Sequence, residues 1–183
     1  MRKAYLALPL LALPLIAAAC MTRQPSYRDT GGEPTTVDRV NLTRYAGTWY
    51  EIARYPNGFE KNCVKPTAEY SLNEDGTVKV VNTCIDTETG KADRAEGTAR
   101  VVEGSNNSKL KVKFAPDWVP FASGDYWILA LEEDYSAALV GSPDGKYLWI
   151  LAREAQPDQT VIDRMLAAAE AKGFETEPLI YTQ

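Results

Sequence analysis

Histidine is absent from this 183-residue sequence, and cysteine occurs only three times. Without histidine the chain cannot build a Ser-His-Asp triad or a histidine-ligated zinc site. It also has no Gly-rich phosphate loop and no serine in a nucleophile-elbow context. The sequence therefore predicts a protein that is not an enzyme and that uses no metal or cofactor.

Clusters of lysine and arginine are missing as well, and the net charge is −5. Nucleic-acid-binding proteins contact phosphates through basic patches, so a nucleic-acid partner is excluded. Carboxylates such as Glu51, Glu69 and Glu132 could do acid–base work, but nothing in the sequence selects two of them as a pair. An envelope enzyme that acts on lipids or small apolar substrates stays open as an alternative function.

The longest apolar run lies at the N-terminus. Met1-Arg2-Lys3 supplies a short positive region, and the apolar residues 4–19 are interrupted by Pro9 and Pro14. This pattern is typical of a secretory signal peptide and is a poor transmembrane helix.

The run ends in "LIAAAC", which resembles the lipobox of bacterial lipoproteins. The resemblance implies that residues 1–19 are removed and that Cys20 is acylated and anchors the chain in a membrane. Ala17 stands where the lipobox usually has Leu, and a plain signal peptide with an incidental cysteine is the alternative. Met21 is not the Asp that resembles an inner-membrane retention signal. We therefore expect the outer membrane, with the protein facing the periplasm.

Residues 21–38 are rich in Thr, Pro, Gly and charge and show no apolar periodicity. With Cys20 they predict an acylated, flexible tether over residues 20–39, followed by one folded domain over residues 40–183. Fully extended, such a tether spans up to roughly 60 Å.

Period-two alternation dominates the folded domain. In "KLKVKF" (109–114), Leu110, Val112 and Phe114 share one face and three lysines share the other, as a half-buried strand requires. Similar runs predict strands over 49–55, 67–72, 77–84, 95–103, 126–131, 137–141 and 147–153, and a short last strand over 178–182.

Turn sequences such as "NEDG" and "SPDG" separate these strands, so consecutive hairpins favour a meander. One helix is predicted to begin at Pro157, with an apolar stripe that Gly173 terminates. The expected fold is all-β: an eight-stranded antiparallel up-and-down barrel with one C-terminal α-helix packed outside.

Three motifs now appear in order: Gly47-Thr48-Trp49-Tyr50 opening the first strand, Asp134-Tyr135 before the seventh, and Arg153 ending "YLWILAR". Together they resemble the lipocalins, most closely the bacterial outer-membrane lipoprotein lipocalins and apolipoprotein D. The resemblance implies that Arg153 packs on the Trp49 indole at the closed end of the barrel. Gly47, which has no Cβ, would let the chain pass close by, so these residues are structural.

The face shared with Arg153 predicts the lining of the barrel. A lipocalin barrel can hold one small ligand or be filled by its own side chains. A filled barrel would make the chain a purely structural outer-membrane protein. The aromatic content and the single polar Asn favour a ligand pocket, and four positions (82, 114, 126 and 149) resemble pocket positions of apolipoprotein D. The expected ligand-binding residues are Val80, Asn82, Val112, Phe114, Tyr126, Ile128, Tyr147, Trp149 and Leu151.

Function follows from this lining and from the anchor. We expect a lipid-binding protein that stores or transports fatty acids or lysophospholipids for membrane maintenance, and that could form a homodimer. Cys63 and Cys84 flank one hairpin, and export to an oxidising periplasm favours a disulfide between them over two free thiols. Residues 115–124 carry Trp118, Val119 and Phe121 at the open end of the barrel, as a lid or as a membrane-docking element.

Overall fold

The structure is a computed structural model that describes residues 24–29, 31–116, 119 and 122–183. The elements follow the chain in this order: α1 (Leu42–Tyr45), β1 (Gly47–Arg54), β2 (Cys63–Leu72), β3 (Val78–Asp86), β4 (Ala92–Val101), β5 (Lys109–Lys113), β6 (Ser123–Leu131), β7 (Ala137–Gly141), β8 (Leu148–Ala152), α2 (Gln159–Ala171) and β9 (Ile180–Tyr181).

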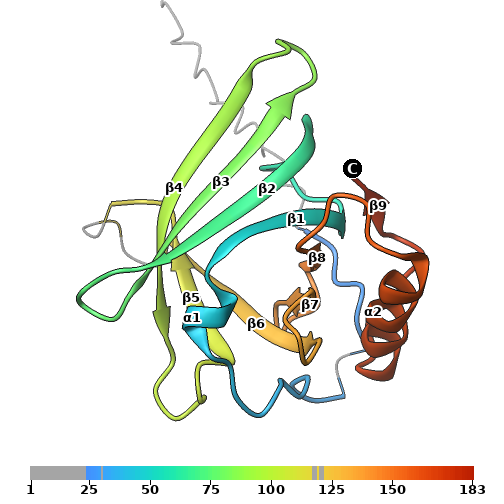
Figure 1. The fold of residues 1–183 in the computed structure, drawn as a ribbon. Helices are drawn as coiled ribbons and strands as arrows, with labels where there is room; N and C mark the ends of the chain where they lie inside the picture. Colours follow the sequence, from blue (N-terminus) through green and yellow to red (C-terminus); the bar gives the residue numbers. More distant parts are fainter. Residues whose placement is uncertain (1–23, 30, 117–118, 120–121) are drawn as a thin grey trace, which may run out of the picture.

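Consecutive strands from β1 to β8 pair antiparallel, and β1 pairs with β8 as well as with β2, which closes the sheet into a barrel. The predicted eight-stranded up-and-down barrel is therefore confirmed. β9 pairs with the C-terminal end of β1, at Ala53 and Arg54. β2, β3 and β4 are long strands of 10, 9 and 10 residues, and they extend beyond the others on one side (Figure 1).

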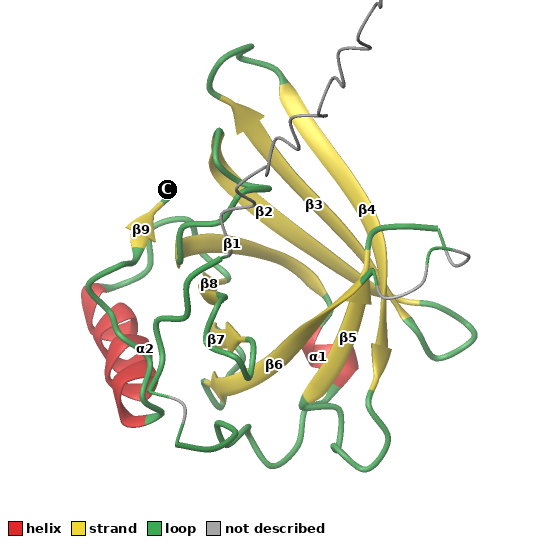
Figure 2. Ribbon diagram, turned by 180° about the vertical axis from the view of Figure 1, so that it is seen from behind, coloured by secondary structure: helices red, strands yellow, loops and turns green. Residues whose placement is uncertain are grey.

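Helix α2 lies outside the barrel, as predicted (Figure 2). Its buried residues Ile162, Met165 and Ala169 share a core with the outward-facing side chains of β1, β6, β7 and β8. The helix begins at Gln159 rather than at Pro157, because Asp158 takes the N-cap position. Within the described residues, no helix is long and apolar enough to cross a membrane.

Helix α1 was not predicted. Asn41 caps it: the side-chain oxygen accepts hydrogen bonds from the backbone N–H groups of Thr43 and Arg44. Four residues are too few for a helical period to show in the sequence. The helix directs Tyr45 into the barrel interior, where it joins the inner core.

The two ends of the barrel differ. The closed end holds α1 and the loops 73–77, 102–108 and 132–136, and the open end holds the loops 55–62, 87–91 and 142–147 and residues 114–116 after β5. Pairing of Gly47 with Tyr70 places the start of β1 at the closed end.

The N-terminal segment packs along the barrel. We call residues 24–29 and 31–38 the N-terminal strap. The sequence predicts a flexible tether here, but the backbone N–H of Tyr27 donates to the Gly145 carbonyl and that of Val37 to the Ile128 carbonyl. Tyr27 also packs edge-on against Tyr55, with ring centroids 4.9 Å apart. Backbone bonds and one isolated aromatic leave no periodic signal, which is why composition alone indicated a free tether.

Candidate ligand-binding calyx

The floor of the barrel is built on Trp49 and Arg153. Trp49 is fully buried, and the Arg153 guanidinium carbon lies 3.9 Å from its ring centroid. Arg153 also donates to the carbonyls of Thr48, Arg44 and Ala46 at 2.8, 2.8 and 2.9 Å. The predicted cation–π contact is confirmed, and the carbonyl bonds show that the same side chain ties α1 to β1 across the closed end.

Gly47 stands next to this plug with φ +95°, a backbone conformation that other residues rarely adopt. A Cβ at this position would lie 3.4 Å from Arg153 Nη1. Both observations explain why glycine precedes Trp49 at the start of β1.

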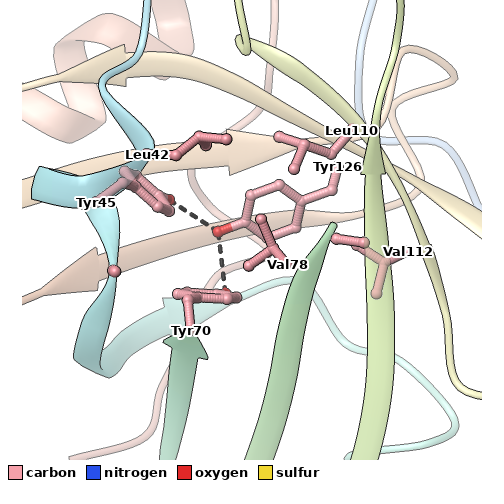
Figure 3. A pocket seen from close by; sticks show the side chains of 9 residues that line it. Leu42, Tyr45, Tyr70, Val78, Leu110, Val112 and Tyr126 are labelled. Atoms are coloured by element: carbon pink, nitrogen blue, oxygen red, sulfur yellow. Dashed lines mark hydrogen bonds between the residues drawn. The ribbon is translucent and has the colours of Figure 1, made fainter. Parts of the chain in front are cut away.

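Above the floor, three tyrosines form a hydrogen-bonded group (Figure 3). The Tyr126 hydroxyl lies 2.8 Å from the Tyr45 hydroxyl and 3.0 Å from that of Tyr70. Burial raises the pKa of Tyr45 and of Tyr70 well above the ordinary tyrosine value, so both stay protonated at neutral pH. The cavity beside them has a volume of about 20 Å³, which is room for about one water molecule. The lower barrel is therefore filled by its own side chains.

The upper barrel opens progressively on the side of β2 to β6. Along β5 the inner face runs from buried Leu110 through half-buried Val112 to Phe114, which is 47% exposed. On β4 it runs from buried Ala99 to exposed Ala95. Much of this wall consists of small residues: Ala68, Ala95, Gly97 and Gly124. The inner face thus becomes more accessible to solvent toward the open end, and we call this upper part of the barrel the calyx.

The β1 side of the calyx remains closed because an ionic cluster occupies it. Arg54 Nε lies 3.2 Å from Glu51 Oε1 and 3.5 Å from Glu60 Oε2, and Glu51 and Arg54 are at most 5% exposed. The indole N–H of Trp149 points at Glu60 Oε2, 3.4 Å away. We call Glu51, Arg54 and Glu60 the calyx ion cluster; it contains two carboxyl groups and one guanidinium.

Glu51 is the most perturbed carboxyl group of this cluster. Burial, reinforced by repulsion from Glu60 and opposed by Arg54, raises the pKa of Glu51 to about 8. On β3, no donor among the described residues hydrogen-bonds the buried Asn82 Oδ1. Asn82 therefore keeps one buried acceptor atom without a partner.

The structure divides the expected ligand-binding residues into three groups. Val80, Ile128 and Leu151 are at most 4% exposed and belong to the packed inner core. Val112 and Tyr126 line the small deep cavity. Asn82, Phe114, Tyr147 and Trp149 lie in the upper calyx, where Tyr147 and Trp149 stack with ring centroids 5.7 Å apart.

Sequence reasoning did not find the calyx ion cluster. Glu51 shares the parity of Trp49 and could have been placed inside on that signal. Arg54 has the opposite parity, and it reaches Glu51 because the pairing register of β1 with β8 shifts between Glu51 and Ala53. Such a bulge reverses the inward face and leaves no mark in the sequence. Glu60 comes from the loop after β1, where periodicity carries no information.

Two further predictions concern the open end. The Cys63–Cys84 disulfide is present, with the Cα atoms 5.4 Å apart. Trp118 and Phe121 lie outside the described residues. Among the residues that the structure describes, no group of three or more His, Cys, Asp or Glu side chains could hold a metal ion.

Comparison with known proteins agrees with this geometry. Residues 40–183 match the family model described as "Lipocalin-like domain". The chain is 38% identical over 174 residues to the outer membrane lipoprotein Blc of Escherichia coli K12, covering 93% of this chain and 96% of Blc. It is 35% identical to apolipoprotein D of Macaca fascicularis, covering 70% of this chain and 69% of that protein.

Among solved structures, insecticyanin from the tobacco hornworm Manduca sexta superposes with a TM-score of 0.67 at 22% identity, covering 87% of each chain. This likeness supports the fold of the barrel and the helix. The family-model match, the sequence identity and the Trp49–Arg153 plug agree with one another. The chain belongs to the lipocalin family.

Proposed function

We propose that this protein is a lipid-binding lipocalin, held in the outer membrane by an acylated Cys20 and facing the periplasm, which stores or transports single-chain lipids for membrane maintenance. The observation that supports it most is the calyx, whose inner face passes from a packed floor to exposed Phe114 and half-buried Trp149. Binding of small hydrophobic molecules is what lipocalin membership implies, and the name of Blc adds the outer membrane.

The polar groups of the calyx favour one of the two expected lipid classes. With Glu51 protonated at neutral pH, Glu60 balances the guanidinium of Arg54, so the cluster offers no net positive charge to the free carboxylate of a fatty acid. Asn82 Oδ1 also requires a donor. A lysophospholipid whose head group carries N–H or O–H donors satisfies both conditions, and its alkyl chain can lie along the small-residue wall of β2, β4 and β6.

The test is a fluorescence titration of the mature protein with lysophosphatidylethanolamine and with a fatty acid of the same chain length. We expect the lysolipid to bind about tenfold more tightly, a difference of about 1.4 kcal/mol. Trp149→Ala should weaken that binding, whereas Glu69→Gln, an exposed change on β2, should not. A protein that binds neither lipid would instead have a fully filled barrel.

The envelope-enzyme alternative is tested on the same sample. Mass spectrometry of the lysolipid after prolonged incubation with the protein should recover it unchanged, because a carrier forms and breaks no covalent bond. Formation of glycerophosphoethanolamine and free fatty acid would show that the protein hydrolyses the lysolipid and is an enzyme instead of a carrier.

A further inference from the structure

Exposed apolar side chains gather at the open end of the barrel. Among the described residues, seven large hydrophobic side chains are exposed, and only Leu72 belongs to the closed end. The other six are on the loop after β1, at the open-end tips of β2, β3 and β5, and on β9 beside the end of β1: Phe59, Val64, Ile85, Phe114, Ile180 and Tyr181. We call these six residues the open rim. Apolar side chains concentrated on one face of a soluble domain mark an interaction surface.

The N-terminal strap leads to the same end of the barrel. It leaves the closed end at Val40, whose N–H donates to the Asn106 carbonyl, and reaches the open-end loops at its other end. There the Gln24 side-chain amide donates to the carbonyls of Pro56 and Lys146. In Figure 1 the blue strap passes between the strands β7 and β8 and helix α2.

The length of chain before Gln24 then limits the distance of the anchor. Three residues lie between Cys20 and Gln24, and the four Cα–Cα steps that join the two span at most about 14 Å when extended. An acyl group on Cys20 therefore lies near the open rim and cannot reach the closed end while the strap stays bound. The sequence alone had allowed a reach about four times as long.

We infer that the open rim docks on the lipid bilayer, so that the mouth of the calyx faces the membrane that holds the acyl anchor. This inference rests on the proposed anchoring at Cys20 and adds the orientation of the barrel and the surface that sets it. An apolar rim beside a lipid anchor gives two membrane contacts at one end. Lipid can then pass between bilayer and calyx without crossing water.

A second copy of the chain is the competing occupant of the open rim. The strap favours the bilayer, because an interface between two rims would have to accommodate two acylated N-termini at its edge. The open end also carries exposed charges of both signs, Lys61, Glu88, Lys91 and Asp93. Mixed charges of this kind select no protein partner of one sign.

Spin labelling of the mature, acylated protein in vesicles tests the orientation. Nitroxide labels are attached at Phe59→Cys and Tyr181→Cys, and at Leu72→Cys as a matched exposed apolar site of the closed end. We expect the two rim labels to become at least fivefold less accessible to a water-soluble relaxing agent when vesicles are present. The label at position 72 should not change. Equal accessibility at all three sites, or protection only at position 72, overturns the inference.

A double variant separates the surface from the binding site. Ile180→Ser combined with Tyr181→Ser removes exposed apolar groups outside the calyx, and Leu72→Ser is its control. The double variant should take up lysolipid from vesicles about tenfold more slowly and bind dispersed lysolipid as the parent chain does. Unchanged uptake from vesicles overturns the inference. The inference is also overturned if the rim labels become protected without vesicles and this protection rises with protein concentration, because a second copy of the chain would then cover the rim. Loss of dispersed-lipid binding in the parent chain would reject the proposed function instead.

Discussion

Arg54 and Glu51 face each other inside the barrel, with Arg54 Nε 3.2 Å from Glu51 Oε1 and both side chains almost completely buried. The second carboxylate, Glu60, lies beside the same guanidinium at 3.5 Å. The calyx ion cluster therefore lies inside the barrel on the open-end side of Trp49. This arrangement makes the stability of the barrel sensitive to pH.

The first prediction concerns that sensitivity. Burial raises the pKa of Glu51 from 4.5 to about 8, so between these pH values the folded chain binds a proton that the unfolded chain has lost. Its contribution to stability is complete below pH 4.5 and is lost as pH rises through 8, with a slope of up to about 1.4 kcal/mol per pH unit. Glu51→Gln should flatten this slope in urea unfolding at pH 5, 7 and 9. The exposed Glu69→Gln is the control, and an equal slope in parent and Glu51→Gln would contradict the prediction.

A second prediction compares two tryptophans. Trp49 is fully buried at the floor, whereas Trp149 is half-buried in the upper calyx. Trp49→Ala should cost about 3–5 kcal/mol of unfolding free energy, and Trp149→Ala should cost less while weakening lysolipid binding. Chemical denaturation and fluorescence titration measure the two effects. Equal destabilisation with unchanged affinity in Trp149→Ala would favour a filled barrel.

Gly47 provides a third test. Its φ of +95° and the 3.4 Å separation of a Cβ from Arg153 Nη1 predict that Gly47→Ala destabilises the chain by about 1–2 kcal/mol. The midpoint of thermal unfolding should fall. Gly76→Ala also has a positive φ but open space around it, so it shows how much of the loss is backbone strain alone.

The fourth prediction is that the Cys63–Cys84 disulfide stabilises the barrel by about 3 kcal/mol, since it closes a loop with a sequence separation of 21 residues. The double variant Cys63→Ser, Cys84→Ser should unfold at a correspondingly lower urea concentration. Alkylation of the native protein without reductant should label neither thiol. Labelling of both would show that the bond does not form in the cell.

Membrane attachment gives the fifth prediction. Cys20→Ser should yield a protein that is no longer lipid-modified and that fractionates away from the outer membrane, because one acylated residue supplies the anchor. Mass spectrometry and membrane fractionation measure the two properties. A Cys20→Ser protein that still carried lipid and stayed in the membrane would refute the lipobox assignment.

The barrel could be predicted because period-two alternation marks strands with one buried face, most clearly β5, and because turn sequences separate the strands. β7 and β8 show little alternation because helix α2 covers their outer face. The same parity placed Phe114 and Trp149 in the calyx. Parity shows which side chains point into the barrel, but it does not show how deeply each one is buried. It therefore could not show that the inner face is tightly packed at Ile128 and exposed at Phe114. Arg54 was missed for a different reason: the bulge after Glu51 reverses the inward face.

Local elements were the hardest to predict. Helix α1 has only 4 residues, which is too short for a helical repeat of apolar residues to appear in the sequence, and its N-terminus is capped by Asn41. The N-terminal strap depends on backbone hydrogen bonds such as Tyr27 to Gly145, which any residue other than proline could donate. Its polar composition therefore indicated a free linker.

The bound strap has a kinetic consequence. Given the proposed anchor at Cys20, the three residues between it and Gln24 would hold the calyx at a high effective concentration of the lipids in its own membrane. Uptake and return should then be first-order processes independent of protein concentration. So short a connection would also keep the mouth from turning toward a distant acceptor, and the proposed lipid carrier would serve its own leaflet unless Tyr27 and Gln24 first released the barrel.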